Sequence, residues 1–515
     1  MKRPLIFHPF LFAIFPVLAL YAYRSRAIPS TLYDIALPLG LSLASSAIMF
    51  FLLKTITQHA RKAGLLTSLA LMWFFSYGHL VARLKLRRFL GDYFIFVGSL
   101  ILLSVFFALV IKSKRSYSRL TYSLNIMSLL LVAFNMVTAS RVFIQSARVS
   151  PAPTIETGRR PVHRPNIYFI LLDAYARSDV LSEIYGCDNS DFIRHLEQKG
   201  FYVAAQSPAN YGQTEFAVAA ALNLAYLDKV AGAMGRGSTN IRPILQMIKN
   251  SEVRHLLKNI GYSFISLSSG LPATEIRNAD QYIGFKGSIK NFRKDLLDTT
   301  PLPLFLNILS DKSQYDLHRA RVLGAFRGLA SLRVEESPYF VFAHILSPHT
   351  PYVFGKNGEA VNPPGRFTVN DGLISDELAR TTYIKGYADQ LRFINKIIIE
   401  TVEGILANSE EPPVIILQSD HGPRAYFSWK DADATYLKES MSVLNAVYFP
   451  GEEYHDFYPE ISPVNTFIAL INRITGSNLG LLEDRSFYAP GGRPYAFSPY
   501  DPHTYTKKLS DFAKD

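Results

Sequence analysis

Five long apolar segments, separated by short basic loops, occupy most of the first 139 residues of the chain. Each is close to the roughly 20 residues that cross the hydrocarbon core of a bilayer. The segment Ile101–Ile111 carries no charge on any face, whereas a helix of a soluble bundle keeps a polar face. We therefore expect a transmembrane bundle of about five spans over residues 1–144, with a soluble bundle as the alternative. The predicted helices are 5–23, 33–53, 64–82, 93–111 and 121–139.

The charges of the loops do not fix the orientation of this bundle. An odd number of spans places the two ends on opposite sides, but Lys and Arg are almost equally numerous in the loops of both sides. The net charge of +12 comes partly from these juxtamembrane residues. The soluble part has no dense Lys/Arg stretch, which disfavours nucleic-acid binding, and the single cysteine, Cys187, excludes an intramolecular disulfide.

A proline-rich linker at 145–163 is predicted to separate the helices from a soluble domain at 164–515. Pro151, Pro153 and Pro161 are typical of an extended segment. Beyond it, apolar runs that suit buried strands alternate with helical patterns, which predicts an α/β sandwich with a mostly parallel central sheet. The region 270–320 has a less regular sequence pattern, and we interpret it as an insertion. The strands are expected at 166–172, 201–205, 261–267, 339–345, 414–417 and 442–449, and the helices at 190–199, 215–224, 241–259, 376–408 and 462–475.

Two of these strands end in residues that bind metals. The run at 414–417 leads into Asp420-His421, and the run at 166–172 ends at Asp173. In α/β sheets, reactive groups lie beyond the carboxyl ends of the strands, so these side chains are candidates for one site. The alternative for Asp420-His421 is a turn in which the Asp accepts backbone bonds and the His lies on the surface.

Two further residues are candidates for this site, and one of them has two possible interpretations. Thr214 lies at or near the start of a helix, where it is either an N-cap or a nucleophile in the positive end of the helix dipole. His349 lies between two prolines in a stiff loop and is a candidate substrate contact. His344, within a strand, is interpreted as a packed core histidine.

Asp173, Thr214, Asp420 and His421 together make a plausible tetrahedral donor set for one Zn²⁺ or Mn²⁺ ion. Such an ion would lower the pKa of the threonine hydroxyl and polarise a phosphoryl oxygen. His349 would then bind the non-bridging oxygens or protonate the leaving group.

The soluble domain resembles the sulfatase-like branch of the alkaline phosphatase superfamily. It is most similar to membrane-anchored lipoteichoic acid synthases and phosphoethanolamine transferases. This resemblance implies an extracytoplasmic catalytic domain on the bacterial inner membrane, one metal held by Asp173, Thr214, Asp420 and His421, and a phospho-threonine intermediate. It also implies His349 and Asn210 as substrate contacts. The motifs that carry it are Asn166-Ile-Tyr-Phe-Ile-Leu-Leu-Asp173, Asn210-Tyr-Gly-Gln-Thr214, Pro348-His-Thr-Pro351 and Ser419-Asp-His-Gly422.

Three differences from that family narrow the predicted reaction, the number of metal ions and the expected disulfides. Thr214-Glu-Phe-Ala-Val218 lacks the Cys or Ser ahead of Pro and Arg that sulfatases oxidise, so sulfate-ester hydrolysis is disfavoured. Ala174 stands where many sulfatases have a second Asp, which favours one metal. The Gram-negative phosphoethanolamine transferases carry several disulfides, which a chain with Cys187 alone does not form.

The sequence therefore predicts a membrane phosphotransferase. It would move a phosphoglycerol or phosphoethanolamine type of headgroup from a membrane lipid donor to a glycan or lipid acceptor. Two alternatives stay open: a phosphodiester or phosphomonoester hydrolase that uses the same site, and a catalytically inactive scaffold or binding protein of the cell envelope.

Overall fold

The computed structural model describes most of the chain. The described ranges are 5–24, 32–84, 91–147, 164–285, 292–306, 314–334, 338–364, 367–372, 374–451 and 454–512. The chain divides into two compact units, one made of Met1–Arg148 with Lys290–Asp311 and the other of Val149–Ile289 with Lys312–Asp515. Most of the predicted linker, from residue 148 to 163, lies outside the described residues, and its first three residues end a helix.

The first unit is a bundle of apolar helices, as predicted. Its five long helices are α1 (His8–Arg24), α2 (Leu32–Thr57), α3 (Ala60–Leu84), α4 (Gly91–Lys112) and α5 (Ser118–Ala147). Four of them, α2 to α5, are long and apolar enough to cross a membrane, whereas α1 has only 17 residues. The described residues therefore contain four candidate spans, or five if the shorter α1 also crosses.

The same unit includes part of the region that the sequence left as an insertion. Residues 292–306 form α12 (Phe292–Asp298) and α13 (Leu302–Leu306). Arg24 Nη1 of α1 lies 2.7 Å from Asp295 Oδ2, and the Gly78 N–H of α3 donates to Thr299 O at 2.8 Å. This segment therefore packs on the apolar helices although it comes from between two parts of the second unit.

The second unit is built on a seven-stranded sheet in the order β2-β7-β6-β1-β5-β3-β4. Strands β6, β1, β5, β3 and β4 are parallel, and β7 is antiparallel to both β6 and β2. The expectation of a mostly parallel central sheet is confirmed. The strands are β1 (Ile167–Leu172), β2 (Phe201–Val203), β3 (Ser263–Leu267), β4 (Gln281–Ile283), β5 (Tyr339–Ile345), β6 (Val414–Gln418) and β7 (Asn445–Tyr448).

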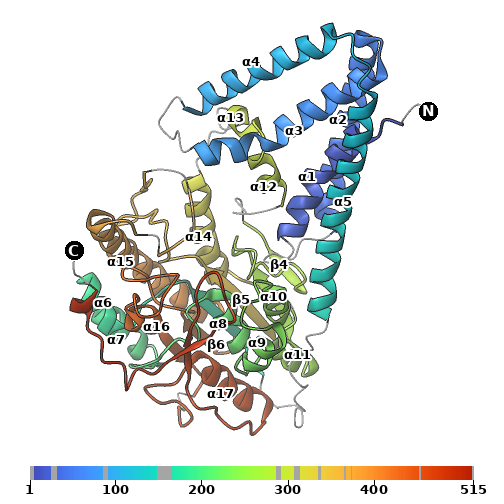
Figure 1. Cartoon of the computed structure of the whole chain (residues 1–515). Helices are drawn as coiled ribbons and strands as arrows, with labels where there is room; N and C mark the ends of the chain where they lie inside the picture. Colours follow the sequence, from blue (N-terminus) through green and yellow to red (C-terminus); the bar gives the residue numbers. More distant parts are fainter. Residues whose placement is uncertain are drawn as a thin grey trace. The chain divides into compact units, whose positions relative to one another are not determined.

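Helices cover both faces of this sheet (Figure 1). Alternate side chains of β1 enter two separate cores, because successive residues of a strand point to opposite faces. Ile167, Phe169 and Leu171 belong to the core that includes α8 (Thr214–Leu222), α10 (Arg242–Lys249), α11 (Glu252–Asn259) and α17 (Pro463–Thr475). Tyr168, Ile170 and Leu172 belong to the core that includes α6 (Ser178–Tyr185), α7 (Ser190–Gln198), α14 (Gln314–Ala330) and α15 (Glu377–Asn408).

The remaining elements surround the sheet. They are α9 (Asp228–Met234), α16 (Leu437–Met441), a small antiparallel pair of β8 (Ser486–Tyr488) and β9 (Ser498–Tyr500), and a 3₁₀ turn at Leu509–Asp511. The predicted helix at 241–259 is two helices, because Ser251 caps α11 by accepting a bond from the Arg254 N–H. The other predicted strands and helices lie within a few residues of their predicted ranges, whereas α6, α9, α14, α16, β4, β8 and β9 were not predicted.

Candidate active site

The two predicted acidic strand ends lie side by side. β6 pairs with β1 in parallel, with Leu171 opposite Gln418, so Asp173 and Asp420 both follow at the same edge of the sheet. Asp420 Oδ1 accepts a bond from the Ala174 N–H at 3.3 Å, and Ser419 Oγ accepts one from the Tyr175 N–H at 2.8 Å. These bonds lock the two chain turns together and bring the carboxylates into one buried cluster.

The cluster contains buried polar atoms that have no hydrogen-bond partner in the described part of the chain: Asp173 Oδ1, Asp420 Oδ2 and His344 Nε2. His421 Nε2 lies 3.7 Å from Asp173 Oδ1 and 3.5 Å from Asp420 Oδ2. The other ring nitrogen of His421, Nδ1, is 2.8 Å from Gly422 O, which is a bond that only a protonated Nδ1 makes. The lone pair of His421 therefore lies on Nε2 and faces the carboxylates, as a metal ligand requires.

Thr214 contributes its hydroxyl to the same cluster. It is the first residue of α8, the N-cap position belongs to Gln213, and no side chain caps the helix. Thr214 Oγ1 instead lies 3.4 Å from His421 Nε2. Of the two interpretations of Thr214, this geometry favours the functional one, since the hydroxyl faces the cluster and not the backbone of its own helix.

His344 is a further member of the cluster, and the sequence interpretation of it as a packed core residue missed this. Its Nε2 is 3.3 Å from Asp173 Oδ2, and Asp173, His344 and Asp420 each offer a ligand atom within 4.8 Å of the others. The signal in the sequence is a polar residue next to the end of an otherwise apolar strand. That position, opposite Leu171 of β1, places it at the same sheet edge.

The hydrogen bonds behind His344 determine which of its nitrogens carries the proton. Ser269 Oγ donates to a backbone carbonyl, Leu271 O, at 3.1 Å, so it accepts the hydroxyl hydrogen of Thr274 at 3.0 Å. Thr274 Oγ1 then accepts from His344 Nδ1 at 2.7 Å. The Nε2 lone pair of His344 is then directed at a carboxylate oxygen of Asp173. Two buried hydrogen-bond acceptors that face each other are unfavourable unless a cation lies between or beside them.

His349 lies on the other side of the site, in a loop that α15 holds. Gln390 of α15 donates to Pro348 O at 3.0 Å and to His349 O at 3.2 Å. His349 Nδ1 is 2.6 Å from Thr350 O, and its Nε2 is 3.7 Å from Asp371 Oδ2. The rings of His349 and His421 are 6.2 Å apart, so His349 borders the cluster without being part of it.

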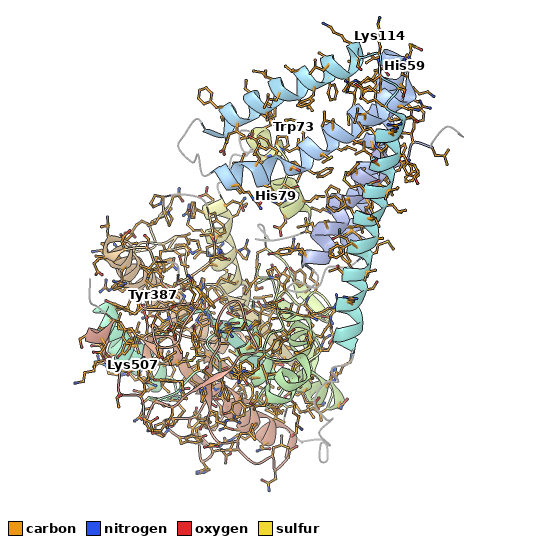
Figure 2. All side chains as sticks on the ribbon, in the orientation of Figure 1. His59, Trp73, His79, Lys114, Tyr387 and Lys507 are labelled. Carbon is orange, nitrogen blue, oxygen red and sulfur yellow. The ribbon has the colours of Figure 1, made fainter. Side chains whose placement is uncertain are left out.

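Tyr387 of α15 fixes the turn after Asp173. Its hydroxyl donates to Ala174 O at 2.9 Å and accepts from the Ala176 N–H at 3.0 Å. Figure 2 labels Tyr387 among the densely packed side chains of the second unit, and the residue is fully buried. The long helix therefore supports both loops that flank the cluster.

Burial and neighbouring charges set the protonation of the site. Burial by itself raises the pKa of Asp173, but the neighbouring histidines, His349 first among them, outweigh it and hold the pKa below its usual range. Burial and the charge of Arg424 lower the pKa of His421. Burial lowers the pKa of His349, but Asp173 and Asp371 outweigh it, so that pKa is raised. The site thus contains ionised Asp173, a neutral His421 that can ligate, and a His349 that holds its proton more tightly than usual.

Asn210 differs from its predicted role. Its side-chain amide donates to Arg485 O at 3.0 Å, and its Oδ1 accepts from the Val464 N–H in the first turn of α17 at 3.0 Å. The residue is fully buried. We therefore assign Asn210 a scaffold role in place of the substrate contact expected from the sequence, because its amide is already engaged inside the protein.

The donor atoms fit a divalent cation. Two carboxylate oxygens and an imidazole nitrogen are buried without partners, and the His421 lone pair and the Thr214 hydroxyl lie beside them. Carboxylate, imidazole and hydroxyl ligands suit Zn²⁺ or Mn²⁺, which this chemistry does not separate. Asp173, Thr214, Asp420 and His421, with His344 in addition, would hold the ion.

No protein-family model matches the chain, and no curated protein matches its sequence significantly. Solved structures similar to it include the C-terminal periplasmic domain of EcEptC from Escherichia coli, with a TM-score of 0.45, 11% identity and coverage of 69% of this chain and 98% of that chain. BT1596, a 2-O GAG sulfatase, gives a TM-score of 0.41, 11% identity, and 62% and 72% coverage.

The soluble domain of lipooligosaccharide phosphoethanolamine transferase A from Neisseria meningitidis gives a TM-score of 0.37, 10% identity, and 62% and 90% coverage. The similar structures thus include a sulfatase and a phosphoethanolamine transferase. At this level of similarity, what this chain does has to be argued from its own site.

Proposed function

We propose that this chain is a membrane-bound, metal-dependent phosphotransferase in which Thr214 is the nucleophile. One observation carries the proposal: the Thr214 hydroxyl lies 3.4 Å from His421 Nε2, beside two carboxylates with unpartnered buried oxygens. A hydroxyl is a weak nucleophile at neutral pH unless a neighbouring group activates it. A divalent ion in this donor set would lower the pKa of the hydroxyl and polarise a phosphoryl oxygen.

In the first step, Thr214 Oγ1 loses its proton to solvent and attacks the phosphorus of a phosphodiester. A new Oγ–P bond forms while the P–O bond to the lipid alcohol breaks. His349 gives its proton to the departing oxygen, a role that its raised pKa favours. The products are the lipid alcohol and a phospho-threonine that carries the headgroup.

In the second step, the acceptor hydroxyl attacks the phospho-threonine. Its proton passes to His349, the Oγ–P bond breaks, and the Thr214 alkoxide that leaves takes a proton back from solvent. The proton that His349 donated in the first step is thereby restored, so the cycle is balanced.

The substrates that we propose follow from the attached helices. Four helices of the same chain can cross a membrane, and a phosphodiester headgroup of a membrane lipid is the donor that such an enzyme meets at high local concentration. The acceptor is a hydroxyl of a glycan or a lipid. In this proposal the protein resides in the bacterial inner membrane with its catalytic unit on the extracytoplasmic side.

Mass spectrometry tests the proposal at two levels. Metal content of the purified full-length protein should be about one Zn or Mn per chain and should be lost in Asp420→Ala. On incubation with lipid donor, the peptide containing Thr214 should gain the mass of the headgroup phosphate, and Thr214→Ala should abolish both this mass and transfer.

Thr401→Val is the matched control, because Thr401 is a buried helical threonine whose hydroxyl, among the described residues, bonds to Ile397 O of its own helix and to no other group. Release of headgroup without a new ester, in the presence of acceptor alcohols, would indicate a hydrolase instead. Protein that lacks both metal and headgroup adduct would favour the scaffold alternative.

A further inference from the structure

Arg424 is a buried cation beside the site that the sequence analysis did not single out. It lies three residues beyond His421 and is 4% exposed. In the part of the chain that the structure describes, no carboxylate forms an ion pair with Arg424, although Glu215 experiences its charge at longer range. Burying an unpaired charge is costly, and proteins normally place a counter-charge beside it.

The guanidinium of Arg424 is held in one position. Its Nη2 donates to Gly212 O at 2.7 Å, in the loop that leads to Thr214. Its plane packs over the rings of Trp429 at 4.6 Å and Phe427 at 5.1 Å. A stacked, hydrogen-bonded guanidinium is pre-organised, so it loses little conformational entropy when it binds a ligand.

One nitrogen of this guanidinium reaches the cluster, and another has no hydrogen-bond partner in the described part of the chain. Nη2 lies 3.1 Å from His421 Nε2, the nitrogen that carries the lone pair and accepts from it, and Nε is buried without a partner in the described residues. A cation that takes the His421 lone pair removes the acceptor of Nη2. The Nη2 hydrogen released in this way and the unpartnered Nε–H are then both available next to His421, whose Nε2 lies 3.4 Å from Thr214 Oγ1.

We propose that the Nε–Nη2 edge of Arg424 binds the tetrahedral oxyanion of the substrate, with Nε and Nη2 donating to two non-bridging oxygens of a phosphodiester. The proposal rests on the proposed function, since it concerns the phosphoryl group that Thr214 attacks. A guanidinium edge matches two oxygens of a phosphate, and the substrate would supply an anion in direct contact with Arg424, which no described carboxylate does. Arg424 therefore orients the phosphorus and favours anionic esters over neutral ones.

Phosphate binding tests this inference without requiring turnover. Inorganic phosphate is titrated by calorimetry into the full-length protein, loaded with Zn²⁺ or Mn²⁺ in detergent. Arg424→Met should weaken phosphate affinity at least about tenfold, and Arg424→Lys, which keeps the charge without the two-donor edge, should lie between it and the wild type. Metal content should stay the same in both variants.

Arg473→Met is the matched control, because Arg473 also stacks on two rings, Phe449 and Phe457, but lies in α17 away from the residues of the cluster. It should bind phosphate as the wild type does. Where Arg424→Met fails to fold, Arg424→Lys decides the question, and wild-type affinity in that variant would overturn the inference, as would a wild-type protein that binds no phosphate.

A comparison of Thr214→Ala with Arg424→Met separates this inference from the proposed function. Thr214→Ala should lose headgroup transfer while it keeps Arg424-dependent phosphate binding. Loss of transfer activity in every substrate screen would leave a measured oxyanion site in place, whereas transfer that persists undiminished in Arg424→Met would refute the role of Arg424 and leave Thr214 as the nucleophile.

Discussion

Thr274 provides the sharpest test of how the site is held, because it touches only the far side of a candidate ligand. Its hydroxyl accepts from His344 Nδ1 at 2.7 Å and donates to Ser269 Oγ at 3.0 Å. Thr274→Val keeps the shape of the side chain and removes both bonds. We expect the variant to fold and to bind Zn²⁺ or Mn²⁺ more weakly.

The magnitude follows from the buried N–H that is left behind. An unsatisfied buried donor costs about 1–3 kcal/mol, and His344 is buried with its Nδ1 facing Thr274. Loss of an outer partner of a metal-binding histidine typically weakens metal affinity about 10–100-fold. The two ranges agree, since about 1.4 kcal/mol corresponds to a factor of ten in affinity.

A competition titration against a fluorescent chelator measures this affinity in the full-length protein. Thr274→Ser, which keeps a hydroxyl, should restore most of the binding, and Thr401→Val controls for the loss of a buried threonine hydroxyl elsewhere. Wild-type affinity in Thr274→Val together with weakened affinity in His344→Ala would refute the orienting role of Thr274. Wild-type affinity in His344→Ala would remove His344 from the ligand set.

Three further predictions concern other parts of the chain. Asp371→Asn should lower the pKa of His349, because Asp371 helps to raise it, so the alkaline limb of the pH–rate profile for headgroup transfer should move to lower pH; an unmoved limb would contradict the pairing. Burial raises the pKa of Glu439 to about 7, above its ordinary value, so the folded protein keeps a proton that the unfolded chain releases. The free energy of unfolding of chelator-treated protein should therefore decrease as pH rises from about 4.5 to about 7, and Glu439→Gln should flatten that part of the curve. Gly78→Ala would place a methyl group 2.0 Å from Asp298 O and should lower the melting temperature by displacing 292–306 from α3, whereas Gly98→Ala, in α4 with no atom within 4 Å of its Cβ, should not.

The sheet was predictable because its strands carry a strong local signal. β1, β5 and β6 are buried along their whole length, so each appears in the sequence as a short, continuous apolar run. The helices α6 and α14 and the strand β4 were missed. β4 has only three residues, of which one is exposed and two are partly exposed, so its sequence carries no such run.

The site was only partly predictable, for reasons that differ from residue to residue. Asp173 and Asp420-His421 end buried strands, which marks them in the sequence. His344 differs from an ordinary core histidine only in the oxygen that it faces, and that oxygen comes from a strand more than a hundred residues earlier in the chain. Arg424 is recognisable only from its missing counter-charge, which is a property of the fold and not of any segment.

The position of β1 in the sheet explains why these residues meet. β1 has β5 on one side and β6 on the other, so the carboxyl end of β1 is the place where the ends of all three strands come within reach of one another. β5 contributes His344 and the loop with His349, β6 contributes Asp420, His421 and Arg424, and Asp173 lies between them. Parallel strands whose connections diverge on either side of a central strand leave a crevice at that point, which is where α/β sheets bind ligands. Thr214 is the one member that no sheet strand delivers, and the bond from Arg424 to Gly212 O ties its loop to the β6 end. A substitution that loosens this tie should therefore affect the placement of the nucleophile as well as the binding of the phosphoryl group.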